Sequence, residues 1–143
     1  MSPVRNAVLL GAAVVGIDGL TKFFAVKKNL PSLFFNSDTL VFGLVKMSGF
    51  FDSLAAAALL LLFTWVYFKY LYSENTLNGY ALIFGGAAAN LLDGFSDGTV
   101  VDFIDIGIST ANLADFAIMG GIVLIALQAI RIPPPKADLP RVR

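Results

Sequence analysis

Cysteine and histidine are both absent from the 143 residues of this chain. Their absence excludes thiolate and imidazole nucleophiles, Ser-His-Asp triads, and metal sites built on thiolate or imidazole ligands. It also excludes disulfides, so cysteine usage gives no evidence about the compartment. Carboxylates are the strongest remaining candidates for acid–base chemistry, and we expect neither a metal ion nor another cofactor.

Charge is also scarce, and it is unevenly distributed. Residues 70–130 contain no lysine or arginine, yet this stretch contains six acidic residues: Glu74, Asp93, Asp97, Asp102, Asp105 and Asp115. Nucleic acid requires an exposed basic stripe, which this distribution does not provide. Hydrophobic residues make up 57% of the chain, charged residues 14%, and the mean hydropathy is +0.80. A soluble helical protein of this composition would have a largely apolar surface, so we expect an integral membrane protein surrounded by lipid.

The first apolar segment, residues 7–26, contains two opposite charges near its end. Asp18 and Lys22 are four residues apart, so they lie on one helical face and can pair, which lowers the cost of each charge near a membrane. Arg5 before an apolar run also resembles the start of a signal peptide, but no small-residue cleavage pattern follows. We predict an uncleaved first transmembrane helix over residues 6–26.

Residues 27–52 are too interrupted to cross a bilayer. Proline, glycine and asparagine separate short apolar runs at 33–35, 40–42 and 50–51, and this pattern favours short strands or a β-hairpin. Its aromatic content suits a segment that lies at the membrane surface, and a connection of this length usually has a function. An ordinary connecting loop is the structural alternative.

Three further segments are apolar enough for spans, at residues 53–72, 77–93 and 112–131. Glycine and alanine at 85–89 permit close approach of another helix. The connection over residues 94–111 contains a β-branched run at 99–106, which predicts a short strand.

Four spans place both ends of the chain on one side of the membrane. The ends and Lys69 carry basic residues, so the positive-inside rule makes that side cytoplasmic, although Lys27, Lys28 and Lys46 in the first outer loop are exceptions. We therefore predict an all-α integral membrane protein with four transmembrane helices and a small extracytoplasmic β-hairpin. It forms a single domain over residues 1–132, followed by a disordered cytoplasmic tail over 133–143.

Asp102 and Asp115 are the two carboxylates that we consider as a candidate pair for acid–base catalysis. Two carboxylates held a few ångströms apart do not both ionise easily and can share a proton. One can then take a proton from water while the other polarises a carbonyl, which is the acid–base work of peptide hydrolysis. The spacing of these residues does not itself bring them together. In the structural alternative, Asp115 caps the last helix and Asp102 is solvated at a strand edge.

Four segments together resemble the motifs of one enzyme family. DGLTK at residues 18–22 is similar to D-x-x-[ST]-K, and GGAAANLLD at 85–93 is similar to G-G-A-x-G-N-x-x-D-R. VVDFID at 100–105 is similar to V-x-D-F-x-D, and NLAD at 112–115 is similar to the end of F-N-x-A-D. In this order, on four predicted spans, they resemble lipoprotein signal peptidase, also called signal peptidase II, a family of intramembrane aspartic peptidases.

The resemblance implies roles for eight residues: Asp102 and Asp115 as the catalytic dyad, Asn90 and Asn112 lining the substrate site, Asp18, Lys22 and Asp93 as supporting residues, and Asn36 in a loosely matched N-x-G-x-A-F segment. It implies removal of signal peptides from diacylglyceryl-modified prolipoproteins in a bacterial inner membrane, with inhibition by globomycin. It also implies an active site at the outer leaflet, with the first outer loop forming a β-cradle. We expect a monomer.

The chain departs from the family pattern at several positions. Gly94 stands where the family usually has arginine, Ala89 where glycine is usual, and Ala111 where phenylalanine is usual. Loss of the arginine removes a planar cation with several donors from the region of the dyad. Two alternatives therefore stay open: a catalytically impaired member that binds lipopeptide or lipid, and a small transporter or proton relay that uses the same carboxylates.

Overall fold

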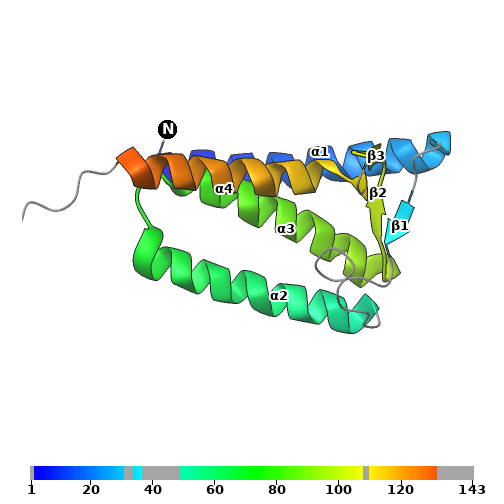
Figure 1. Cartoon of the computed structure of the whole chain (residues 1–143), viewed down its shortest axis with the longest axis horizontal. Helices are drawn as coiled ribbons and strands as arrows, with labels where there is room; N and C mark the ends of the chain where they lie inside the picture. Colours follow the sequence, from blue (N-terminus) through cyan, green and yellow to red (C-terminus); the bar gives the residue numbers. More distant parts are fainter. Residues whose placement is uncertain (1, 31–33, 37–48, 108–109, 132–143) are drawn as a thin grey trace, which may run out of the picture.

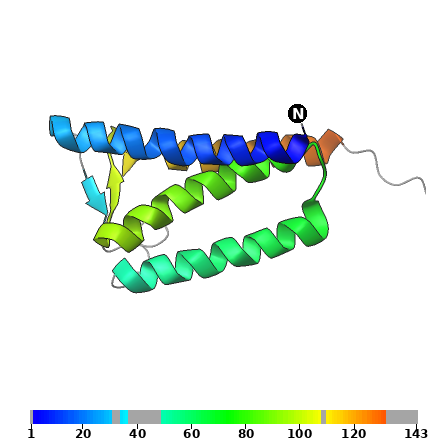
Figure 2. The same cartoon turned by 180° about the vertical axis from the view of Figure 1, so that it is seen from behind.

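The computed structural model describes residues 2–30, 34–36, 49–107 and 110–131. In these residues, four long helices run side by side and short strands gather at one end of the bundle (Figure 1). The start of helix α1 and the end of helix α4 both lie at the opposite end, as the view from behind also shows (Figure 2). The predicted tail over 133–143 lies outside the described residues.

Helix α1, Pro3–Lys28, is the longest of these helices. It begins where the Ser2 side chain accepts a hydrogen bond from the Arg5 N–H, and it ends at Asn29 in the left-handed conformation. At 1.5 Å per residue it is about 39 Å long, more than the roughly 30 Å of a bilayer's hydrocarbon core. The helix therefore extends beyond the predicted span of 6–26 at both ends.

Helix α2, Gly49–Val66, continues into a π-helical turn, η1, Tyr67–Leu71. A tight turn then leads to helix α3, Leu77–Asp97. Thr76 fixes this turn, because its hydroxyl contacts the Tyr67 hydroxyl at 3.1 Å and accepts from the Ser73 N–H at 3.0 Å. The turn holds the end of α2 against the start of α3.

Helix α3 is longer than the predicted span of 77–93. It ends at Gly98, whose φ of 69° is a left-handed conformation that glycine adopts without strain. Asp93 and Gly94 are consequently helical residues, because a single glycine weakens a helix without ending it.

Three of the described helical stretches are long and apolar enough to cross a membrane: Pro3–Lys28, Ser53–Leu71 and Leu113–Ile130 of helix α4, Leu113–Arg131. Helix α3 does not meet the same criterion, because glycine, asparagine and aspartate lower its hydropathy. It lies within the bundle and contacts α1, α2 and α4, so its polar residues are covered by protein as well as by lipid. Because three neighbouring helices contact α3, it can contain polar residues that would be unfavourable in a helix surrounded by lipid.

Small residues bring α3 close to two neighbours. A Cβ atom at Gly85 would overlap the backbone of Gly11 in α1, and one at Gly86 would overlap the carbonyl oxygen of Ala114 in α4. These close approaches confirm the packing predicted for 85–89, and they carry the polar end of α3 into contact with both helices.

The strands form two small antiparallel pairs. Strand β1, Phe34–Asn36, pairs with strand β2, Val100–Asp102, and strand β3, Ile104–Asp105, pairs with strand β4, Thr110–Ala111. The described strand of the first loop therefore pairs with the second connection, rather than with its own loop as a hairpin would. The run at 40–42 of the predicted hairpin lies outside the described residues. The prediction for 50–51 is wrong, because these residues continue the long apolar run that follows them and belong to helix α2.

Large hydrophobic side chains cover the outside of the bundle. Leu61 and Met119 are 70% and 64% exposed, whereas the buried side chains include alanines and several polar residues. This distribution is the one expected where lipid, not water, surrounds the helices.

Candidate active site

Polar side chains from three helices and a strand meet at the end of the bundle where the strands lie. Asp18 and Lys22 come from α1, Asn90 and Asp93 from α3, Asp102 from β2, and Asn112 and Asp115 from the start of α4. Asp18, Lys22, Asp102 and Asn112 are at most 5% exposed. The structure thus brings together seven of the eight residues that the sequence analysis singled out.

Asn112 links the two proposed catalytic carboxylates. Its side-chain amide donates to Asp102 Oδ1 at 2.7 Å, and its backbone N–H donates to Asp115 Oδ2 at 3.1 Å. Its side-chain oxygen accepts from the Asp115 N–H at 3.1 Å. Asn112 and Asp115 therefore form a reciprocal capping box at the first turn of α4.

The alternative to a catalytic pair was that Asp115 caps the last helix and Asp102 is solvated at a strand edge. The structure agrees with the first part and not with the second. Asp115 does cap the last helix, and the same contact fixes its carboxylate beside Asn112. Asp102 is not solvated at a strand edge: it is 5% exposed, because β1 covers β2 on one side and Asn112 contacts its carboxylate.

Asn90 makes the second link between the carboxylates. Its amide nitrogen donates to Asp115 Oδ1 at 2.9 Å, and its oxygen accepts from the Asn112 amide at 3.0 Å. Its oxygen also accepts from the Lys22 ammonium at 3.0 Å. Asn90 thus connects the carboxylate pair to the charged residues of α1.

Lys22 is held between two carboxylates in a buried position. Its ammonium lies 2.6 Å from Asp18 Oδ2, which confirms the predicted i,i+4 pair, and 2.7 Å from Asp93 Oδ2. Burying an unpaired ammonium would lower the stability of the fold, because the charge loses its hydration. The two carboxylates and the Asn90 oxygen replace that hydration around Lys22. Asp93 is therefore a structural partner of Lys22.

Asp18 also reaches a helix that the sequence did not connect to it. Its Oδ1 accepts the backbone N–H of Ala114 at 2.9 Å, across 96 residues of sequence. The first N–H groups of a helix have no partner within the helix and carry partial positive charge, so a carboxylate there is favourable. No local pattern predicts this contact, because the donor is a backbone group.

Asn36 is the eighth predicted residue, and it lies in β1 opposite Val100. This pairing places its backbone beside the strand that ends in Asp102. Its assignment to the site stays a prediction.

Gly94 is buried where α3 meets the start of α2. A side chain at this position would begin in the space that the Ser53 hydroxyl occupies. The residue that departs from the family pattern thus lies at a contact between two helices, which no local pattern in the sequence predicts.

Comparison with known proteins decides the family. The model of the family described as Signal peptidase (SPase) II matches residues 10–131. The chain belongs to the signal peptidase II family. The match covers α2, α3 and α4, most of α1, and every residue of the polar network.

Relatives named lipoprotein signal peptidase agree with this assignment. The lipoprotein signal peptidase of Thermodesulfovibrio yellowstonii is 33% identical over 135 residues, covering 80% of this chain and 88% of that protein. That of Moorella thermoacetica is 31% identical over 139 residues, covering 85% and 91%. The match to that of Nostoc sp. is 44% identical over 66 residues and covers 44% of this chain and 42% of that protein.

A solved structure described as a bacterial membrane enzyme superposes with a TM-score of 0.76 at 22% identity, covering 97% of this chain and 95% of the other. A second, with the same description, gives a TM-score of 0.74 at 22% identity. These likenesses confirm the predicted fold of a helical membrane protein.

Proposed function

We propose that this chain is an aspartic endopeptidase that removes signal peptides from diacylglyceryl-modified prolipoproteins, with Asp102 and Asp115 as its catalytic dyad. Membership of the signal peptidase II family supports the reaction, as do relatives named lipoprotein signal peptidase. The observation that carries the assignment of the dyad is the link through Asn112, which contacts both carboxylates.

The proposed chemistry uses a water molecule between the two carboxyl groups, which together hold one proton. The ionised carboxylate takes a proton from the water as its oxygen bonds to the scissile carbonyl carbon, and the protonated carboxyl gives its proton to the carbonyl oxygen. A tetrahedral diol results. Its C–N bond then breaks as one carboxyl of the dyad gives a proton to the amide nitrogen and the other carboxylate takes a proton from a diol hydroxyl. This step releases an amine and a carboxylic acid, returns the dyad to one proton and leaves no covalent intermediate.

The other polar residues hold this pair in place. The side-chain amides of Asn112 and Asn90, and the backbone N–H of Asn112, donate hydrogen bonds to oxygens of the two carboxylates. All of these donors are neutral. Lys22, Asp18 and Asp93 form a supporting layer that joins α1 to α3 and α4. Positioning of this kind reduces the reorganisation that the reaction would otherwise require.

The arrangement of the bundle supports an orientation in the membrane. The described termini lie at one end, where Arg5 and Lys69 are exposed, and the polar network lies at the other (Figure 1). We assign the basic end to the cytoplasm of a bacterium by the positive-inside rule. The dyad then lies at the outer leaflet, level with a cleavage site anchored by the acyl chains of its substrate.

Cleavage of a diacylglyceryl-modified prolipoprotein by purified protein in detergent tests the function. We expect Asp102→Asn and Asp115→Asn each to lower kcat by about a hundredfold to ten-thousandfold, the usual contribution of a positioned acid or base. Glu74→Gln, which neutralises an exposed carboxylate at the opposite end, should leave the rate unchanged.

Full cleavage by both aspartate variants would contradict the dyad. The natural chain is compared with and without globomycin in the same assay, because inhibition of cleavage would support the family's reaction. Binding of globomycin without any turnover would favour the alternative of an impaired member that binds lipopeptide.

A further inference from the structure

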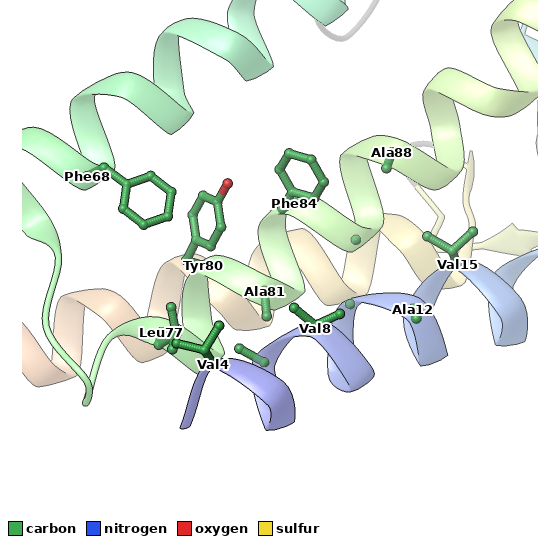
Figure 3. Close-up of a pocket in the computed structure, with 13 residues that line it drawn as sticks. Val4, Val8, Ala12, Val15, Phe68, Leu77, Tyr80, Ala81, Phe84 and Ala88 are labelled. Atoms are coloured by element: carbon green, nitrogen blue, oxygen red, sulfur yellow. The ribbon is translucent and has the colours of Figure 1, made fainter. Parts of the chain in front are cut away.

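A groove of about 390 Å³ runs between α1 and α3 on the side that faces α2. Val4, Val8, Ala12 and Val15 line it along α1, and rings of Phe68, Tyr80 and Phe84 gather on its α2 side (Figure 3). Its lining is almost entirely apolar. In a bilayer such a groove opens onto hydrocarbon and must be filled by something apolar.

We propose that this groove binds one acyl chain of an anionic phospholipid from the leaflet at the N-terminal end of α1. The inference is independent of the proposed catalytic function. It rests on the length of the groove, its shape and the basic residues at the same end of the bundle.

The length of the groove matches one leaflet. Its lining on α1 extends from Val4 to Val15, which is eleven helical steps or about 17 Å, close to half of a hydrocarbon core of about 30 Å. The lining on α3 begins at Leu77, the first residue of that helix. The groove therefore starts at the membrane surface and ends near the midplane, as an acyl chain does.

The shape of the groove suits a chain more than a helix. Alanine methyl groups and the backbone of glycine residues form its floor where α1 contacts α3, and the aromatic rings form a wall. Tyr80 stacks on Tyr67 at 4.3 Å and its hydroxyl contacts Thr64 of α2 at 3.3 Å, so this wall is fixed. Because lipid offers no hydrophobic driving force between apolar surfaces, close packing in a preformed groove is what retains a chain.

Basic residues at this end of the bundle favour an anionic headgroup. Arg5 follows Val4 and Lys69 follows Phe68, and both basic side chains are exposed. Lys69 also lies 4.6 Å from the ring of Trp65, an exposed aromatic residue typical of the membrane interface. Glu74 is the exposed acidic residue at this end of the described chain, so the local balance is positive.

The groove is separate from the polar network. None of its lining residues, all of them within the described chain, comes from α4 or from a strand, and Asp102 and Asp115 are carried by those elements. It lies in the opposite leaflet from the dyad. A lipid there is consequently a structural partner and not the acyl chains of a substrate at the active site.

Native mass spectrometry of the delipidated protein in detergent, titrated with phosphatidylglycerol of 16- and 18-carbon chains, tests the proposal. We expect one tightly retained lipid, and weaker retention of phosphatidylcholine with the same chains. Ala12→Phe fills the groove and should weaken phosphatidylglycerol binding by about tenfold or more. Ala13→Phe adds the same ring at an exposed position on α1 outside the lining, and should bind as the natural chain does.

Three results would overturn the proposal. One is equal retention of phosphatidylglycerol by both phenylalanine variants and the natural chain. The second is a dimer in light scattering that only Ala12→Phe disrupts, which would make the groove a contact between copies. The third is a raised KM for lipopeptide in Ala12→Phe with unchanged lipid binding, which would assign the groove to the signal peptide. Thermal unfolding identifies a variant that has failed to fold.

Discussion

Asn112 has two structural roles, one in helix α4 and one at the strand that carries Asp102. It caps α4 through Asp115, and its amide reaches Asp102 on a separate strand. The sequence shows the first task, because an asparagine three residues before an aspartate at the start of an apolar run is a recognisable helix start. The second could be predicted only from the family resemblance, since no local rule relates residue 102 to residue 112.

The two tasks of Asn112 can be separated by substitution. Asn112→Ser keeps an N-cap oxygen and should retain most of the stability, whereas Asn112→Ala should lower the free energy of unfolding by about 0.5–2 kcal/mol. Both variants lose the amide that contacts Asp102, and we expect kcat to fall by about a hundredfold in each, as for a misplaced catalytic group. Thermal unfolding and cleavage are measured on the same preparations. Full activity of the serine variant would show that the amide does not position Asp102.

At the scale of the elements, α3 organises the bundle through its small residues. Its glycines allow α1 and α4 to approach from two sides, and the residues that follow them, Asn90 and Asp93, are thereby brought to their partners. The sequence predicted this packing from composition. It did not predict the extension of α3 to Asp97, because the only local signal at Gly94 was ambiguous between a helix end and a tight contact.

A pair of glycine substitutions tests the contact of α3 with α4. Gly86→Ala places a methyl group against the carbonyl oxygen of Ala114, and we expect it to destabilise the fold by about 1–3 kcal/mol. Gly120→Ala has nothing within 4 Å of the added methyl group and should raise stability by up to about 1 kcal/mol through helix propensity. Thermal unfolding in one detergent compares them. If both variants unfold at a higher temperature than the natural chain, by the same amount, the close contact at Gly86 adjusts to the added methyl group without loss of stability.

At the scale of the whole molecule, the site depends on segments that are far apart in the chain. Strand β1 pairs with β2 across the two connections, and Asp18 reaches Ala114. The membrane class and the three most apolar helices followed from hydropathy, α3 was predicted from a shorter apolar run, and the Asp18–Lys22 pair followed from helical spacing. The strand pairing did not, because a pairing between two loops leaves no periodic signal in either of them.

Orientation in the membrane can be measured without a background signal, because the chain has no cysteine. A single cysteine at exposed Ile106, beside the polar network, should react with an impermeant maleimide in intact cells. A cysteine at exposed Asn75, in the turn between α2 and α3, should react only after the membrane is permeabilised. The reverse pattern would place the dyad on the cytoplasmic side and contradict the proposed orientation.

The contact between Asp18 and the first turn of α4 has a consequence for biogenesis. Helix α1 is synthesised first, and its carboxylate already has Lys22 as a partner within the same helix, so the helix can enter the bilayer with its charges compensated. The backbone partner of Asp18, and the capping box beside it, exist only once α4 has been made. The carboxylate pair that we propose as the dyad therefore comes together only after α4, the fourth of the described helices, has joined α1.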